Sequence, residues 1–323
     1  MSESFIEANT DPKKKPTRRK NTKRQQNKAM EPDKLSAEQL AADYGYALQV
    51  INADPEIKAV FEQAVEEQWT PARFTAALRN TNWYQNNSEY AREAFILRSM
   101  GGADWEEAQN NARLAVEQAA VDAGAQLTPE QIQQLALRYI NEGWDRPGRG
   151  TLLSRALSED ITAGPTGSLR GMAGNVEDQL RQTAFMNGIT YDSGFFTSAA
   201  KSINSQLSTL DDWERDIRDK AASLYPVFQN QIKAGVSVRE LASPYINLMS
   251  QTLEIDPNQI NLNDPYIRSA LGGFDDSGNP QATNLWDFQK KLRNDPRWMN
   301  TLQANNEIAG MADRVMQMFG LRG

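Results

Sequence analysis

The sequence of 323 residues contains no cysteine and no histidine. Disulfide bonds, zinc sites with Cys or His ligands, thiol nucleophiles and Ser-His-Asp triads are therefore excluded. Long apolar runs are also missing, so no segment is expected to span a membrane. The first residues carry no apolar segment after a basic stretch, which argues against a secretory signal. We expect the chain to stay in the cytoplasm in which it is made, or to be packaged there.

Carboxylate chemistry remains open to such a chain, but the acidic residues give no positive signal for it. The pairs Glu66-Glu67, Glu106-Glu107 and Asp211-Asp212 lie in very polar stretches, where burial would not raise a pKa. Two acidic turns, 256–264 and 275–279, lack the glycine and the final glutamate of a calcium loop and are interpreted as helix caps and turns. We predict no enzyme and no catalytic, cofactor-binding or metal-binding residues, and no cofactor is expected.

Charge is divided unevenly along the chain. Residues 1–30 carry nine cations against three carboxylates, a net charge of +6, so the remainder of a chain of net charge −7 carries −13. The sequence predicts that residues 1–33 form a disordered basic tail, because few apolar side chains are available there to offset the ordering entropy. Contact with nucleic-acid phosphates, contact with an acidic protein surface, and a plain solvated tail all remain open. The candidate nucleic-acid-binding residues are Lys13, Lys14, Lys15, Arg18, Arg19, Lys20, Lys23, Arg24 and Lys28.

Helix signals follow one another from Ser36 onward. Capping boxes are predicted at Ser36, Thr128 and Ser237, and cap-plus-proline starts at Asp54 and Thr70. Helical periodicity is predicted over 90–100, 105–123, 131–142, 213–233 and 306–319. The sequence therefore predicts an all-α protein, with at most a small β-hairpin near 272–285. We expect an N-terminal helical lobe over 34–160, a Gly/Pro-rich linker over 161–174 and a C-terminal helical lobe over 175–323.

One motif occurs twice, 214 residues apart. Phe-x3-Leu-Arg-Asn is followed by tryptophan in both copies, at Phe74, Leu78 and Trp83 and again at Phe288, Leu292 and Trp298. A second likeness at near-equal spacing relates Phe61, Thr70 and Phe74 to Phe228, Ser237 and Leu241. We expect each tryptophan to fold back onto the preceding helix as a core residue, the alternative being an exposed aromatic anchor for a partner. A repeated unit of this kind indicates a scaffold.

Several stretches of the C-terminal half carry a resemblance to a known family. They are Tyr225–Tyr245, Thr252-Leu-Glu-Ile-Asp-Pro257, Asp264–Leu271, and Leu285-Trp-Asp-Phe-Gln with Asp295-Pro-Arg-Trp298. Over about 225–300 the chain resembles virion structural proteins of tailed bacteriophages that infect actinobacteria, and its first half does so more loosely. The resemblance implies a non-enzymatic part of the particle at the portal, neck, tail or inner capsid, made in the host cytoplasm.

Other virion proteins are then the expected partners, with several copies in a symmetric assembly and the basic tail on packaged DNA or an acidic surface. Two alternatives stay open. One is a scaffolding protein or assembly chaperone absent from the mature virion, and the other is a peptidoglycan-cleaving virion enzyme.

Overall fold

The computed structural model describes residues 34–319, and over these residues the protein is all-α, with 70% helix and no strands, as predicted. The expected hairpin near 272–285 is a turn closed by a single antiparallel bridge between Phe274 and Pro280. The predicted tail over 1–33 lies outside the described residues. The N-terminal helices are α1 (Ala37–Asp43), α2 (Leu48–Asn52), α3 (Pro55–Glu66), α4 (Pro71–Arg79), α5 (Asn82–Asn86), α6 (Glu89–Met100), α7 (Gly102–Ala123), α8 (Pro129–Asn141) and α9 (Thr151–Ser158).

The helices of the second half include three short 3-10 segments. They are α10 (Gly171–Met186), α11 (Ser193–Asn204), α12 (Leu210–Leu224), η1 (Pro226–Phe228), α13 (Gln229–Lys233), α14 (Val238–Leu241), α15 (Ser243–Leu253), η2 (Pro257–Gln259), α16 (Pro265–Leu271), α17 (Leu285–Arg293), η3 (Pro296–Asn300) and α18 (Leu302–Met318).

Local signals set the helix starts as the sequence predicts. Ser36 and Thr128 form reciprocal capping boxes with Gln39 and Gln131. Asp54 and Thr70 accept hydrogen bonds from the first backbone N–H groups of α3 and α4, each of which begins with proline. At Ser237 the hydroxyl accepts from the N–H of Glu240, so the cap is present but the predicted box lacks its second hydrogen bond.

The prediction of one continuous helix over 213–233 is wrong. The α-helix α12 ends at Leu224, and Tyr225 leaves the helical conformation with φ −125° and ψ 66°. Proline at 226 has no N–H to continue the ladder and disfavours the helical conformation of the residue before it. The chain therefore turns through η1 before α13 begins.

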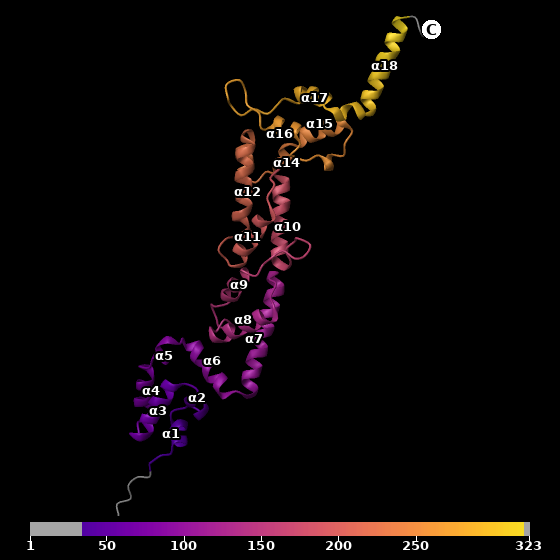
Figure 1. Ribbon diagram of the computed structural model, residues 1–323. Coiled ribbons are helices and arrows are strands. Elements are labelled where there is room, and N and C mark those ends of the chain that lie inside the picture. Colours follow the sequence, from indigo (N-terminus) through magenta and orange to yellow (C-terminus); the bar gives the residue numbers. More distant parts are fainter. Residues whose placement is uncertain (1–33, 320–323) are drawn as a thin grey trace, which may run out of the picture.

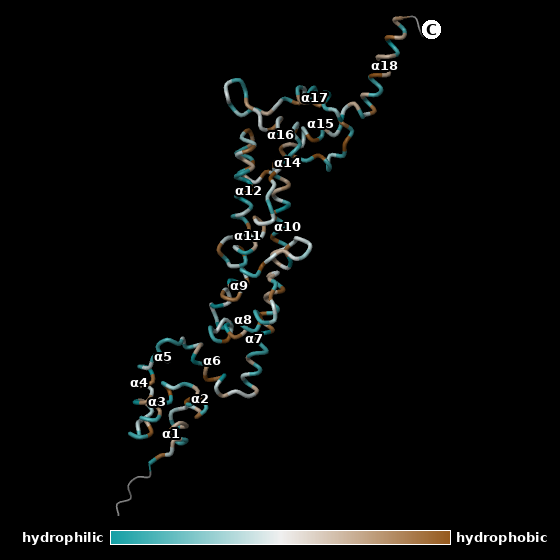
Figure 2. The backbone as a smooth tube through the Cα atoms, viewed as in Figure 1, coloured by the Kyte–Doolittle hydropathy of each residue, from teal (hydrophilic) through white to brown (hydrophobic). Residues whose placement is uncertain are grey.

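The helices are arranged as an elongated rod (Figure 1). Helices α1–α5 form one end, α6–α9 and then α10–α12 continue the rod, and α14–α17 form the other end, from which α18 projects. Apolar and polar residues alternate along the helices (Figure 2). Within residues 34–319, no helix is long and apolar enough to cross a membrane.

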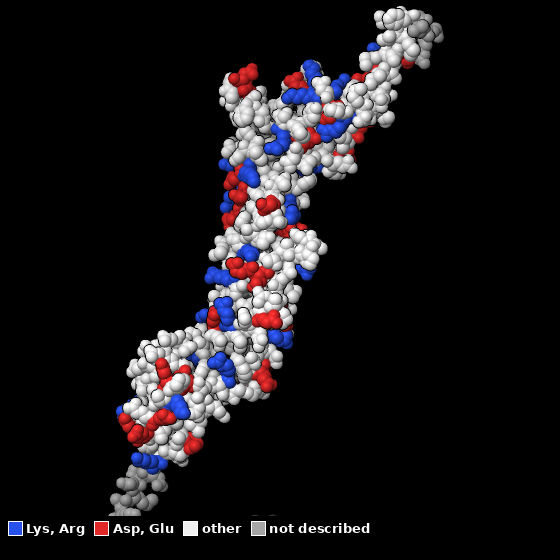
Figure 3. Space-filling view, in the orientation of Figure 1, with Lys and Arg blue, Asp and Glu red and all other residues white. Residues whose placement is uncertain are grey.

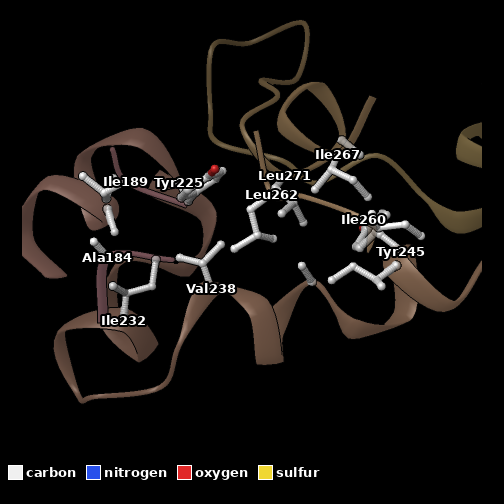
Figure 4. Packing of buried hydrophobic residues seen from close by; sticks show 14 of the residues in the cluster. Ala184, Ile189, Tyr225, Ile232, Val238, Tyr245, Ile260, Leu262, Ile267 and Leu271 are labelled. Carbon is white, nitrogen blue, oxygen red and sulfur yellow. The ribbon is translucent and has the colours of Figure 1, made fainter. Parts of the chain in front are cut away.

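Buried apolar side chains gather in successive clusters along the rod. One cluster runs from Leu40 to Trp83 within α1–α5, and a second, from Ala112 to Leu157, joins α7, α8 and α9. The largest runs from Leu180 to Leu292 and joins α10–α13 to α14–α17. In Figure 4, Val238 and Leu262 lie between the two halves of this cluster. The second terminal group of helices is therefore packed continuously onto the middle of the rod.

The predicted linker over 161–174 runs past the end of α7. Ile161 and Leu169 are buried in a small cluster with Ala173 of α10 and Ala200 of α11, and Ala125 forms a bridge with Ile161. Gly124 ends α7 at φ 82°, and a Cβ there would lie 2.0 Å from the carbonyl oxygen of Arg170. A side chain at Gly124 would therefore clash with the backbone at the start of α10. The division into two lobes stays a prediction.

Candidate functional site: a helical module at each end

The repeated motif belongs to a longer unit that is present at both ends of the rod. We call residues 36–83 the first module and residues 237–298 the second module. Each contains, in the same order, a serine cap followed by Leu-Ala and a tyrosine, then Asp-Pro-x-Ile, then Phe-x3-Leu-Arg-Asn and a tryptophan. The corresponding segments are 36–44 and 237–245, 54–57 and 264–267, and 74–83 and 288–298.

A tyrosine and a phenylalanine form the centre of each module. In the first, the ring of Tyr44 stacks on that of Phe74 with centroids 4.4 Å apart. In the second, Tyr245 meets Phe288 edge-on at 5.3 Å. Both phenylalanines are fully buried. The same pair of residue types is thus brought together across 30 positions in the first module and 43 in the second, although the ring geometry differs.

The two tyrosine hydroxyls make the same hydrogen bond. The hydroxyl of Tyr44 donates to the carbonyl oxygen of Trp69 at 2.8 Å, and that of Tyr245 donates to the carbonyl oxygen of Thr283 at 2.7 Å. Each acceptor immediately precedes the N-cap residue of the helix that carries the phenylalanine. The bond therefore fixes the start of α4 in one copy and of α17 in the other.

The Asp-Pro segments also act alike. Asp54 accepts from the N–H of Glu56 at 2.8 Å, and Asp264 accepts from the N–H of Tyr266 at 2.9 Å. The isoleucine that follows, Ile57 or Ile267, is fully buried. In both copies, a helix is therefore capped by aspartate and buries the isoleucine of its first turn.

Of the predicted motif residues, the phenylalanines and leucines lie on α4 and α17, whereas the tryptophans lie on α5 and η3. Leu78 and Leu292 are buried beside the two phenylalanines. Trp83 is buried against Phe95 of α6, with ring centroids 5.3 Å apart. Trp298 is half-buried against the large cluster, and its indole Nε1 is buried without a hydrogen-bond partner. These placements correspond to the core interpretation of the motif more closely than to an exposed anchor.

The second likeness in the sequence pairs the wrong residues. The structure gives Ser237 the place of Ser36, because both cap a helix that leads to the hydroxyl-donating tyrosine. Thr70, with which the sequence comparison aligned Ser237, corresponds to Asn284, the cap of α17. The identity Ser-x3-Leu-Ala-x2-Tyr was the signal that could have shown the longer repeat.

The second module carries an ion-pair network that the first lacks. Its tryptophan follows one residue later, and Arg297 lies in this longer turn. The Arg297 guanidinium donates to Asp295 from Nε at 2.9 Å and to Asp264 from Nη1 at 2.9 Å. Burial acts to raise the pKa of Asp295, but the hydrogen bonds from Arg297 outweigh it and hold the pKa below its usual value. Thr81 takes the place of Asp295 in the first module and caps α5 with its hydroxyl.

The acidic turns act as helix caps and turns, as predicted. Asp256 and Asp264 cap η2 and α16, and Asp275 accepts from the N–H groups of Ser277 and Asn279. These hydrogen bonds lower the pKa of Asp275, that from Asn279 most. No group of three acidic side chains within residues 34–319 is placed to hold a metal ion.

In two of the three carboxylate pairs, one member accepts hydrogen bonds that favour its charged form. The Trp69 indole N–H donates to Glu67 and lowers its pKa, and the Thr209 hydroxyl does the same for Asp212. Glu106 and Glu107 are exposed on α7. A cavity of about 370 Å³ lies between α6, α7 and α8, and Glu93 and Arg146 at its lining pair with each other at 2.8 Å. None of these groups is arranged as a matched acid and base.

Exposed apolar side chains are concentrated at the end of the rod that carries the second module. Ten of the eighteen large exposed ones within residues 34–319 lie between Phe274 and Phe319. Trp286, at the start of α17, is 63% exposed, with the Lys290 ammonium 3.3 Å from its ring centroid. On the visible face, α18 carries few charges, whereas the rest of the rod is dotted with both signs (Figure 3). Large exposed apolar patches are typical of surfaces that contact another molecule.

The nine predicted nucleic-acid-binding cations lie between Lys13 and Lys28, outside the described residues. Comparisons of the chain with protein-family models, with curated proteins and with solved structures find no match.

Proposed function

We propose that the chain is a non-enzymatic structural protein of a tailed-bacteriophage virion, docked on other virion proteins at the portal, neck, tail or inner capsid. The proposal rests on the resemblance of about 225–300 to virion structural proteins. This segment includes the whole second module. The rod with one module at each end supports a scaffold function, because the side chains that define the modules are used to pack helices together.

The observation that carries the proposal is the pairing of these two modules at opposite ends. Their defining side chains, Tyr44 with Phe74 and Tyr245 with Phe288, are buried and maintain the shape of each end. Two similarly built ends joined by a helical rod suit a protein that bridges neighbouring subunits. In a symmetric particle, several copies would repeat the same bridge.

The basic tail supplies the second part of the proposal. Its net charge of +6 beside a body of −13 favours contact with DNA phosphates or with an acidic surface in the particle. Nine cations can release several counterions at once, so binding to a polyanion would weaken steeply with salt.

Quantitative mass spectrometry of gradient-purified particles tests the proposal. A structural protein is present at a fixed copy number similar to that of other minor virion proteins. Absence from mature particles, with presence in immature ones, would instead identify an assembly chaperone. A clearing zone on host cell wall in a zymogram, lost on neutralising one acidic residue, would identify a peptidoglycan-cleaving enzyme.

A further inference from the structure

We propose that α18 forms a parallel two-stranded coiled coil with α18 of a second copy of this chain. The inference does not depend on the proposed virion function. It rests on the spacing and branching of the apolar side chains of α18, on how the helix leaves the rod, and on the comparison of the two modules.

The apolar residues of α18 and its cap follow a heptad pattern. Starting from the cap, the spacing alternates between three and four residues over Thr301, Ala304, Ile308, Met311, Val315 and Met318. Thr301 and Ala304 are buried on the rod, whereas Ile308, Met311, Val315 and Met318 are 42%, 57%, 51% and 85% exposed. A narrow stripe confined to the a and d positions is the surface through which one helix packs on another in a coiled coil.

The branching of the side chains specifies the kind of coil. Ile308 and Val315 occupy the a positions and are both β-branched. Met311 and Met318 occupy the d positions and are both unbranched. β-Branched residues at a with leucine at d favour a parallel dimer over higher oligomers, and methionine shares with leucine the lack of a branch at Cβ.

The contacts that hold α18 to the rod involve its first two turns. The carboxylate of Glu254 accepts from the N–H groups of Leu302 and Gln303 at 2.8 and 3.1 Å, and Arg293 pairs with Glu307 at 3.5 Å. Beyond this base the helix extends away from the body (Figure 1). The exposed half of the stripe is therefore carried clear of the rod, where a second helix can lie along it.

The first module shows what covers a helix in this position. Its closing segment α5 is followed by α6, capped by Ser88, just as η3 is followed by α18, capped by Thr301. Helix α6 packs against α2, α7 and α8, and Ala94 is buried there. In the first module, helices supplied by the same chain thus cover α6. Within residues 34–319, no helix covers the exposed stripe of α18 in this way.

The residues flanking the stripe permit a partner identical to α18. In a parallel coil, residue 307 of one helix faces residue 312 of the other, and residue 314 faces residue 319. These pairs are Glu307 with Ala312 and Arg314 with Phe319, so no like charges meet. Two copies of α18 can therefore pair without repulsion between like charges at these positions, and the coil would place two second modules side by side with both first modules away from it.

Sedimentation equilibrium of the full chain tests the proposal. We expect a monomer–dimer equilibrium, and the double variant Met311→Lys/Val315→Lys should raise the dimer dissociation constant at least about tenfold. The matched control Ala309→Lys/Gln317→Lys adds the same charge to the same helix off the stripe and should leave the constant unchanged. A chain that is monomeric at about 100 µM, a trimer, or a dimer insensitive to the stripe variant would overturn the proposal.

The direction of the coil can be tested separately because the chain has no cysteine. Identical a positions face each other in a parallel coil, so Val315→Cys should give a disulfide-linked dimer under mild oxidation. Ala309→Cys, off the stripe, should remain largely unlinked. Linkage at Ala309 equal to that at Val315, or no linkage at Val315 in a chain that sediments as a dimer, would contradict the parallel arrangement.

Discussion

The hydroxyl of Tyr245 donates a hydrogen bond of 2.7 Å to the carbonyl oxygen of Thr283, one residue before the cap of α17. Tyr44 makes the equivalent bond to Trp69, one residue before the cap of α4, at the other end of the rod. A bond between a buried side chain and a backbone carbonyl 25 or 38 residues away is not dictated by local propensity. Its presence in both copies is the most specific evidence that the two modules are built alike.

Removal of either hydroxyl should destabilise its own module. In Tyr44→Phe or Tyr245→Phe, a carbonyl oxygen loses its partner, and we expect a loss of about 1–2 kcal/mol in the free energy of unfolding. Denaturant titration followed by circular dichroism measures this loss. The control is Tyr266→Phe, since the Tyr266 hydroxyl makes no hydrogen bond within the described residues. Equal losses in all three variants would show that the two hydrogen bonds do not contribute specifically to the free energy of unfolding.

Truncation of the central phenylalanines should have a larger and more local effect. Phe74→Ala or Phe288→Ala leaves a cavity in a closed core and should cost about 3–5 kcal/mol. Hydrogen exchange should then lose protection over 36–83 in the first variant and over 237–298 in the second. Phe274→Ala removes an exposed ring and should change stability by less than about 0.5 kcal/mol. Protection lost along the whole rod in Phe74→Ala would show that the modules do not unfold separately.

Acid should weaken the second module through Asp295. Its pKa is lower in the folded protein than in the unfolded chain, so its contribution is present above the unfolded value of about 3.9 and is lost as the pH falls through the folded value. Asp295→Asn should cost about 1.5–3 kcal/mol at pH 7 and reduce the fall in stability between about pH 5 and 3. Urea titrations at several pH values measure both effects. An unchanged acid dependence in Asp295→Asn would assign that dependence to other carboxylates.

Deletion of residues 1–33 should abolish binding to duplex DNA if the tail contacts phosphates. The full chain should lose affinity steeply between about 50 and 200 mM salt, as expected when several phosphates are neutralised. Gel-shift titrations at several salt concentrations measure this slope. A full-length variant with the nine cations replaced by glutamine is the matched control and should behave like the deletion. If DNA affinity were retained after both changes, the DNA-binding surface would lie on the rod. Contact with an acidic surface would then be the expected role of the tail.

The sequence allowed the fold class and most helix starts to be predicted, because a cap is a local signal. Ser36, Thr128 and Asp54 each lie within three residues of the N–H groups that they bind. The prediction of one helix over 213–233 was wrong because the apolar periodicity of the sequence continues past Pro226, whereas the α-helical hydrogen-bond pattern cannot continue through that proline. Local pattern therefore identified helices better than it identified their ends.

The extent of the repeat could not be predicted by comparing fixed spacings. The segments between tyrosine and phenylalanine differ in length at two places. From the tyrosine to the Asp-Pro segment there are 10 positions in the first module and 19 in the second, and from there to the phenylalanine there are 20 and 24, the second of which includes the turn at 274–280. The contact of Tyr245 with Phe288 and the hydrogen bond from Tyr245 to Thr283 show that both additions leave this pair of residue types together. The placement of the tryptophans differs for a similar reason: one extra residue before Trp298 moves it to a half-buried position and introduces Arg297.

A cryo-electron microscopy map of the intact particle tests the central claim most directly. The account predicts rod-shaped helical density at the portal, neck, tail or inner capsid, with the modules around Tyr44 and Tyr245 at its two ends and other virion proteins against it. A complete map of the mature particle in which all density is assigned to other proteins and this rod is absent would contradict the account.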